Sequence, residues 1–386
     1  MKKIFLLLTA SFLLSFGAFA QDDQAWTLPQ CIEYAQTHSP GVLQTRTQIA
    51  SQQILENSQQ NSWVPVVSLQ GGFYKSFATT STQRFNYPFA YAFASGMLYD
   101  GGARRANVKA VHSQIDALEA NLDKALQDLT VQVSTLFLQA QFLQTQADLL
   151  RRKTDSTLSE QNATRLQQEA DLAAMVDQYT QVRLSLARLI GAPDPIAFHV
   201  APMESQALSE EQLVVPDPAQ TEVPLDQFPS IRAAQSQVQA SEYSLKAAKS
   251  NYLPKLSWSI QTGSYYIDYY QRQDWNAIYG PFARQAKEHF IFMPAVTLNL
   301  PVLNLVQTRN AVRQSRVMLD NSQQMLDVAQ KQVSAEACQA YTTTLAARAK
   351  YLALAAQTTD STDVNLQYAM YDYLIKRSIL DFYLSR

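Results

Sequence analysis

The sequence contains the same structural unit twice, in tandem. Residues 40–77 align without a gap on residues 229–266, and residues 97–110 align on residues 301–314 after a longer loop in the second copy. The anchors of the alignment are Pro40 with Pro229, Trp63 with Tyr252, Pro65 with Pro254 and Ser68 with Ser257. A repeat of this length indicates two copies of a whole supersecondary assembly rather than a short-period solenoid. The fold must therefore be one that two similar halves build together.

Residues 1–20 have the pattern of a secretory signal peptide. Lys2 and Lys3 precede an apolar run that ends in Ala18-Phe19-Ala20, directly before Gln21. This order of a charged region, an apolar region and small residues predicts export, with a mature chain that begins near Gln21. No later apolar stretch reaches the roughly 18 residues that a transmembrane helix needs. Any membrane that this chain spans must be crossed by strands.

Composition narrows the class of protein further. Removal of Lys2 and Lys3 takes the formal charge from −2 to −4, which argues against nucleic-acid binding. Glycine is scarce, with 10 residues in the chain, as expected for long helices. The two cysteines, Cys31 and Cys338, could pair after export or could both be small packing residues.

Two long segments have the period of coiled-coil helices. Between residues 103 and 152, apolar or small side chains recur at alternating steps of three and four, and residues 306–358 keep the same period. Long helices are therefore expected at 103–155 and 306–370. At 1.5 Å per residue, a helix of 50 residues is roughly 75 Å long. A dimeric coiled coil would explain these helices if they stood alone.

Four shorter segments, however, alternate with a period of two. These are residues 66–77, 89–99, 255–266 and 290–300, with bulky side chains on one face and small or polar ones on the other. About ten residues of such alternation is typical of transmembrane β-strands. A half-buried sheet in a soluble domain would alternate equally well, but the adjoining helices are too long for a globular core. The residues expected to face lipid include Phe73, Phe93, Trp258 and Phe292.

Four strands cannot close a barrel, because the smallest single-chain bacterial barrels have about eight. An open sheet edge is not tolerated in lipid. The chain is therefore expected to form oligomers, and three copies would supply twelve strands.

These elements together resemble the TolC-like outer-membrane efflux protein family. The segment WTLPQCIEYAQTHSPGVL (26–43) resembles the family's opening helix, and SLARLIGAPD (185–194) resembles the end of its first half. The elements NSWVP (61–65) and SNYLP (250–254) resemble its helix-to-strand junctions. The resemblance covers nearly the whole mature chain.

The resemblance implies a fold of mixed α and β structure, mainly α, with two tandem repeats. It implies a homotrimer in the outer membrane of a Gram-negative bacterium, in contact with outer-membrane lipid. Twelve strands would form a β-barrel, continued by a long α-helical coiled-coil barrel in the periplasm. Substrates would pass through the channel to the exterior. They would come either from an inner-membrane pump that is joined to the channel by a periplasmic adaptor (membrane fusion) protein, or from a type I secretion transporter.

The expected domain organisation follows the repeats. The first repeat, 21–191, holds a helix, two strands, the long helix 103–155 and a returning helix 166–190. A proline-rich connector at 192–228 corresponds to the family's equatorial region. The second repeat, 229–386, ends in a returning helix that is expected to be truncated relative to the family, because the chain stops five residues after Asp381.

The resemblance also implies where functional residues should lie. Asp171 and Asp381 are predicted to occupy equivalent places in the two halves and to line a periplasmic gate, although either could be an ordinary solvated helix acid. Adaptor-docking tips are predicted at two tripeptides that lack the family's usual glycine, Thr164-Arg165-Leu166 and Leu374-Ile375-Lys376, the second being extended by Arg377.

No arrangement of residues predicts catalysis. The four histidines (His38, His112, His199 and His289) are scattered without metal-ligand spacing, and no nucleophile triad or phosphate loop occurs. Neither an enzyme, nor a metal site, nor a cofactor is therefore expected. The main rival interpretation is a periplasmic coiled-coil adaptor or structural protein without a transmembrane barrel.

Overall fold

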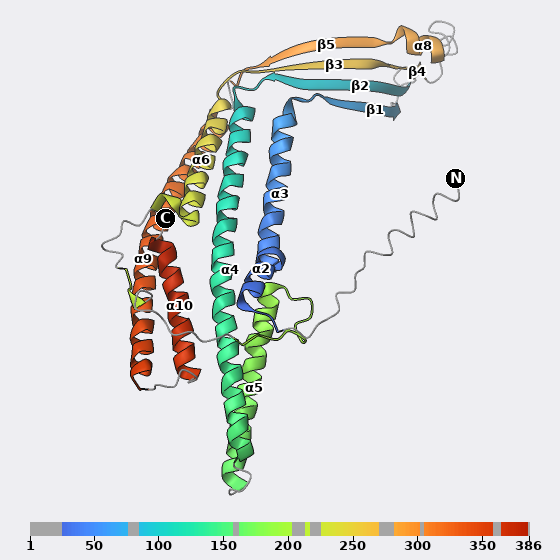
Figure 1. Ribbon diagram of the computed structural model, residues 1–386. Helices are drawn as coiled ribbons and strands as arrows, with labels where there is room; N and C mark the ends of the chain where they lie inside the picture. The colour runs from blue at the N-terminus through green and yellow to red at the C-terminus, as the bar shows by residue number, and fades with distance from the viewer. Residues whose placement is uncertain are drawn as a thin grey trace, which may run out of the picture. The chain divides into compact units, whose positions relative to one another are not determined.

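The computed structural model describes most of the chain. The described residues are 25–75, 85–156, 162–202, 213–216, 225–269, 282–301, 305–357 and 364–384. They are mainly helical and contain one small antiparallel sheet (Figure 1). The expected fold class is thus confirmed, while the predicted signal peptide lies outside the described residues.

The chain divides into two compact units that cut across the sequence repeats. The helical unit consists of Met1–Arg46, Leu122–Pro224 and Val333–Arg386. The sheet unit consists of Thr47–Asn121 and Leu225–Gln332. Each unit takes segments from both repeats, so a repeat of the sequence is not a unit of packing.

The sheet unit contains four long antiparallel strands in the order β1-β2-β3-β5 (Figure 1). They are β1 (Val66–Lys75), β2 (Phe85–Tyr99), β3 (Lys255–Tyr265) and β5 (Ile291–Asn299). The two-residue strand β4 (Asp268–Tyr269) pairs with the start of β2. Because β1 and β2 belong to the first repeat and β3 and β5 to the second, the β2–β3 ladder joins the two repeats. Among the described strands, none pairs with the outer edge of β1 or of β5.

Long helices lead into and out of the sheet. The helices α3 (Pro40–Gln60) and α6 (Pro229–Ser250) precede β1 and β3, and α4 (Ala103–Ser156) and α9 (Leu305–Gln357) follow β2 and β5. Small residues let helices approach closely within this unit. The buried Oγ atoms of Ser241 in α6 and Ser322 in α9 lie 2.7 Å apart.

A glycine pair turns the chain from β2 into α4. Gly101 and Gly102 have φ angles of 71° and 86°, which residues with a Cβ rarely adopt. Asp100 caps the new helix, because its carboxylate accepts hydrogen bonds from the amides of Gly102 at 2.9 Å and Arg104 at 2.6 Å. The sequence Asp-Gly-Gly therefore fixes the point at which the strand becomes a helix.

The helical unit is built on the packing of α2 (Leu28–His38) and α5 (Asn162–Ile190) against α4. Its core is apolar and almost fully buried, as the helical periodicity predicts: Cys31, Ala35, Leu129, Val133, Phe137, Ala140, Leu186, Ala187 and Ile190. A capping box formed by Thr27 and Gln30 starts α2. None of the described helices of the chain is long and apolar enough to cross a membrane.

The second helical hairpin differs from its prediction. The helix expected at 306–370 ends at Gln357, and a separate helix, α10 (Val364–Leu384), follows. The Thr344 hydroxyl donates to the Lys376 carbonyl at 3.0 Å, and the Tyr383 hydroxyl donates to the Glu336 carboxylate at 3.1 Å. These contacts run in opposite directions along α9 and α10, so α10 is the returning helix whose loss was expected.

The two cysteines do not pair. Both are free, Cys31 being buried in the core of the helical unit and Cys338 being exposed on α9. Burial raises the pKa of the Cys31 thiol to about 12, so it remains a neutral packing residue. The packing interpretation thus holds for Cys31 and is wrong for Cys338.

Candidate functional site: the two faces of the sheet and the helical hairpins

The register of the sheet determines which side chains share a face. In an antiparallel sheet, directly paired residues project to the same side, and successive residues of a strand alternate between sides. Phe73 pairs with Pro88, Trp258 pairs with Gly96 and Val296, and Ile260 pairs with Ala94. These pairs assign every residue of the four strands to one of two faces.

One face, which we call the apolar face, carries almost only apolar side chains over most of the sheet. It comprises Val67, Leu69, Phe73, Pro88, Ala90, Ala92, Ala94, Gly96, Leu256, Trp258, Ile260, Phe292, Pro294, Val296 and Leu298. Its polar members, Lys75, Thr262 and Ser264, lie toward the end where β4 pairs with β2. Large side chains on this face are exposed within the chain, with Leu69 at 85% and Val296 at 68%. An exposed apolar patch of this kind marks a surface that contacts lipid or protein.

The other face, which we call the polar–aromatic face, combines polar side chains with rings. Its polar residues are Ser68, Gln70, Ser95, Lys255, Ser257, Ser259, Gln261, Thr297 and Asn299. Its aromatic residues are Tyr74, Tyr87, Phe89, Tyr91, Phe93 and Tyr265. Four of these six rings come from β2.

The register corrects one of the four predicted lipid-facing residues. Phe73, Trp258 and Phe292 share the apolar face, but Phe93 pairs with Ser68 and Gln261 on the polar–aromatic face. On the apolar face, β2 carries small residues where the neighbouring strands β1 and β3 carry bulky ones. Strand β2 is inverted in this sense, and its own bulky residues lie on the polar–aromatic face. The alternation of β2 shows only which of its residues share a face, and the pairing with β1 and β3 decides which face that is.

Glycines on adjacent strands accommodate the large rings on both faces. A Cβ at Gly96 would lie 2.7 Å from Nε1 of Trp258, and a Cβ at Gly72 would lie 2.5 Å from Cζ of Phe89. A Cβ at Gly263 would lie 2.6 Å from Cδ1 of Tyr91. Each ring therefore packs over a glycine of the neighbouring strand, where no side chain fills the space. Packing of an aromatic ring over a glycine is a known way to stabilise glycine in a sheet. The sequence analysis missed this role for the three glycines, although glycine inside an alternating strand is a signal of close approach.

The first predicted docking tip lies at the start of a helix. Arg165 and Leu166 belong to the first turns of α5, which begins at Asn162, and not to a turn between helices. The Leu166 side chain is 65% exposed. The residues that join α4 to α5, 157–161, lie outside the described part of the chain.

The second predicted docking tip is wrong. Ile375, Lys376 and Arg377 lie in the interior of α10, far from the segment that joins it to α9. The Lys376 ammonium pairs with Asp372 at 2.7 Å, one helical turn earlier. The joining residues 358–363, Thr-Thr-Asp-Ser-Thr-Asp, are a polar run of the kind that ends one helix and caps the next. This run was the sequence signal that could have located the hairpin correctly.

The two predicted gate acids do not occupy equivalent places. Asp171 is the tenth residue of α5, whereas Asp381 is the eighteenth residue of α10. Asp171 is exposed and accepts a hydrogen bond from Gln167 at 3.0 Å. Asp381 accepts hydrogen bonds from Arg377 Nε to both carboxylate oxygens, at 2.9 and 3.0 Å. The described ion pairs include one between Asp381 and Arg377 and none that involves Asp171.

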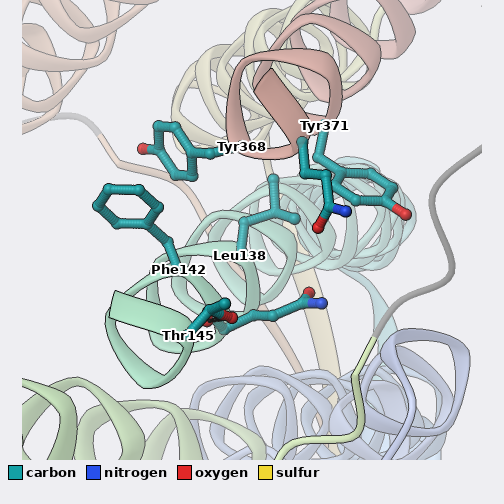
Figure 2. A pocket seen from close by; sticks show the side chains of 7 residues that line it. Leu138, Phe142, Thr145, Tyr368 and Tyr371 are labelled. Carbon is teal, nitrogen blue, oxygen red and sulfur yellow. Dashed lines mark hydrogen bonds between the residues drawn. The ribbon is translucent and has the colours of Figure 1, made fainter. Parts of the chain in front are cut away.

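Aromatic packing holds α10 against α4 in the helical unit. Figure 2 shows the rings of Phe142 and Tyr368 next to each other where they line a small pocket, and their ring centroids lie 4.5 Å apart. Leu138 of α4 packs with Met370 and Tyr371 of α10 in a separate buried cluster. Burial raises the pKa of the Tyr383 hydroxyl, and the adjacent Glu336 carboxylate raises it further. That hydroxyl therefore remains a donor to Glu336, which stabilises the end of α10 on α9.

Comparison with known proteins relates these surfaces to one class of protein. The sequence model of the outer membrane efflux protein family matches residues 31–188. No curated protein sequence matches this chain significantly.

Solved structures share the fold over most of the chain. A membrane protein from Pseudomonas aeruginosa is 17% identical, with a TM-score of 0.65, and the match covers 92% of this chain and 89% of that one. The open-state MtrE outer-membrane channel of Neisseria gonorrhoeae is 15% identical, with a TM-score of 0.61, over 96% and 90% of the two chains. The outer-membrane protein VceC of Vibrio cholerae is 14% identical, with a TM-score of 0.58, over 92% and 91%.

The fold is therefore that of the outer-membrane efflux channels. The resemblance to the TolC-like outer-membrane efflux protein family, expected from short sequence elements, is confirmed by the family match in the first half and by the fold of the whole chain.

Proposed function

We infer that this chain is one protomer of an outer-membrane efflux channel. The observation that carries this inference is the sheet, which has one exposed apolar face and two outer edges without a partner among the described strands. A sheet with open edges is not stable in lipid, and a sheet with a wholly exposed apolar face is not stable in water. Insertion of several copies into one closed barrel satisfies both requirements.

The direction of the strands supports closure by identical copies. Since β1, β2, β3 and β5 alternate in direction, β5 of one copy placed beside β1 of the next continues the antiparallel order. Three copies give twelve strands, an even number within the range of bacterial outer-membrane barrels. We propose a homotrimer in the outer membrane, with the helices extending into the periplasm.

The polarity of the faces sets the orientation of the sheet within the barrel. The apolar face, with Phe73, Trp258 and Phe292, meets lipid. The polar–aromatic face, with Phe93 among its rings, meets the lumen. This assignment follows from the apolar outer band and polar interior of transmembrane barrels.

The channel conducts substrates passively toward the exterior and is not an enzyme. They arrive from an inner-membrane pump through a periplasmic adaptor, as in tripartite efflux systems, or from a type I secretion transporter. The exposed Leu166 and the adjacent Arg165 lie within five residues of the α4–α5 connection, where an adaptor could reach them. No corresponding role remains for Ile375, Lys376 or Arg377.

A periplasmic gate is better assigned to Asp171 than to Asp381. A ring of three carboxylates near a pore axis favours cations over anions. The carboxylate of Asp381 is already paired with Arg377, which reduces its field, whereas the bond given to Asp171 by the described residues comes from the neutral amide of Gln167. We expect Asp171→Asn to reduce cation selectivity in single-channel recordings, and Asp381→Asn to change it less. An equal loss in the two variants would contradict this assignment.

Crosslinking of native membranes tests the proposed function. The outer-membrane fraction should contain a species of three times the protomer mass, and purified trimers should form conducting pores in planar bilayers. A monomer that is released from the periplasm without detergent would overturn the proposal. It would favour the rival class, an adaptor or structural protein.

A further inference from the structure

We propose that the polar–aromatic face carries a binding track for planar aromatic cations. The track consists of Tyr74, Tyr87, Phe89, Tyr91, Phe93, Tyr265 and His289. The inference rests on the proposed function in one respect, because that function places this face toward the lumen. It goes further in assigning a ligand class and the residues that bind it.

The rings form an unbroken series. Along β2, the ring centroids of Phe89 and Tyr91 lie 5.3 Å apart and those of Tyr91 and Phe93 lie 6.1 Å apart. The ring of Tyr74 stacks on Phe89 at 5.3 Å.

The series continues from β2 onto the second repeat. Tyr87 stacks on Tyr265 at 5.1 Å, and Tyr265 stacks on His289 at 4.6 Å. A ligand can therefore pass from one ring to the next without leaving an aromatic surface.

On β2 the track follows the strand, and at one end it extends across to β1 and β3, where Tyr74 pairs with Tyr87 and Tyr265 pairs with Phe89. Residues 87–93 span roughly 20 Å of extended chain at about 3.3 Å per residue. The aromatic girdles of membrane barrels instead form bands at the two interfaces of the bilayer. A girdle would also require these rings on the apolar face, where the register does not place them.

The rings present their faces to the lumen because of the glycines beneath them. Phe89 lies over Gly72 of β1, and Tyr91 lies over Gly263 of β3. One side of each ring is thus covered by the backbone of the adjacent strand. The rings of Phe89 and Tyr91 are nevertheless only half-buried within the chain, and that of Tyr74 is 62% exposed, so part of the ring surface can contact a ligand.

The charge of this face favours a cation. Among the described strand residues of the polar–aromatic face, Lys255 is the sole charged one. It lies at the far end of β3, where its ammonium donates to Asn251 at 2.9 Å. The electron-rich ring faces of β2 can therefore attract an organic cation without an ammonium among the strand residues beside them, and a planar cation adds stacking to the charge–quadrupole attraction.

A saccharide is the alternative ligand that the test must separate from a cation. The Tyr87 and Tyr91 hydroxyls lie 3.1 Å apart and are bonded to each other. Ser68, Gln70 and Gln261, however, pair with Phe93 or Tyr91 on the same face and offer hydrogen-bonding groups beside the rings. Block by an oligosaccharide is therefore compared with block by a planar cation below.

The test is block of single trimeric channels in a planar bilayer by ethidium, a planar aromatic cation. We expect ethidium to block the unmodified channel in a concentration-dependent way. Tyr91→Leu and Phe93→Leu should each raise the blocking concentration about two- to five-fold, because each removes one ring of the track. The matched control, Phe292→Leu, makes the same kind of change on the apolar face and should leave the block unchanged.

Each outcome decides the proposal. Channels that conduct but are not blocked by ethidium would overturn the track, and this result needs no variant. Equal effects of Phe93→Leu and Phe292→Leu would also overturn it, as would stronger block by maltohexaose than by ethidium. A protein that forms no channel at all would instead refute the proposed function, so the two failures are distinguishable.

Discussion

Strands β2 and β3 lie side by side and alternate with the same period, yet Tyr91 of β2 and Trp258 of β3 project to opposite faces of the sheet. Trp258 of β3 occupies the apolar face and lies over Gly96 of β2. Tyr91 of β2 occupies the polar–aromatic face and lies over Gly263 of β3. The two strands thus exchange roles, each providing the glycine that accommodates a ring of the other. The position of a glycine on the adjacent strand is what distinguishes the two arrangements.

The difference also separates two uses of aromatic residues. On β3, an aromatic ring adds apolar area to a surface that already carries Leu256 and Ile260. On β2, aromatic rings stand among serine and glutamine, and small alanines replace them on the apolar face. Aromatic content alone therefore does not identify a lipid-facing strand.

The largest expected effect comes from placing a charge at Trp258 of β3, whose face of the sheet we propose to meet lipid. Trp258→Arg should cost on the order of 2–4 kcal/mol if the side chain lies near the bilayer midplane. Ser259→Arg, one residue along on the other face, should leave assembly largely intact and alter conductance instead. The measurement is the yield of folded trimer in the outer membrane, followed by single-channel recording. Equal yields for the two variants would show that the faces have been exchanged.

A second pair of substitutions tests the inversion of β2. Ala94 pairs with Ile260 on the apolar face, whereas Phe93 lies on the polar–aromatic face. Ala94→Arg should cost about 2 kcal/mol or more, and Phe93→Arg should be tolerated, although it removes the larger apolar side chain. The opposite order of trimer yields would restore the expectation from sequence alone, in which Phe93 faces lipid.

Sequence patterns predicted the elements of this fold better than their relations. Strict alternation located all four long strands, because the period of side chains along a strand is an intrinsic property of extended backbone. The face of Phe93 depended on its pairing with Ser68 and Gln261, which lie far away in the sequence. No local pattern contains that information.

The helical hairpins show the same limit. Heptad periodicity correctly indicated long packed helices, but the second hairpin tip was placed by the resemblance of a short segment to the family's turn, and that segment lies within α10. The predicted equivalence of Asp171 and Asp381 was wrong for the same reason. Local polar composition, read as a break in the helix, would have been the better guide there.

A smaller effect is expected from filling the space beneath a ring. Gly263→Ala should destabilise the trimer by about 1–3 kcal/mol, because the new Cβ meets the backbone carbonyl of Ala90 as well as the Tyr91 ring. Gly71→Ala is the matched control, since its Cβ would have an ordinary contact of 3.7 Å with the Phe89 carbonyl. Thermal dissociation of the trimer in detergent measures both. If Gly71→Ala proves as costly as Gly263→Ala, the glycines do not act by accommodating rings.

The smallest expected effect comes from removing a hydroxyl group of β2 while its ring is kept. Tyr91→Phe keeps the ring and removes the hydrogen bond to Tyr87. The loss should cost about 0.5–1.5 kcal/mol of stability. The cost should lie toward the lower end of this range, because water in the lumen can replace the lost partner. Tyr99→Phe, at the other end of the same strand and on the apolar face, should change stability by less than about 0.5 kcal/mol. The thermal dissociation temperature of the trimer distinguishes the two variants.

Because the ring remains, Tyr91→Phe should also leave ethidium block within about twofold of the unmodified channel. If Tyr91→Phe instead weakened the block as much as Tyr91→Leu does, the hydroxyl groups and not the ring faces would bind the ligand. The functional difference between β2 and β3 would then lie in their polar atoms and not in the faces on which their rings lie.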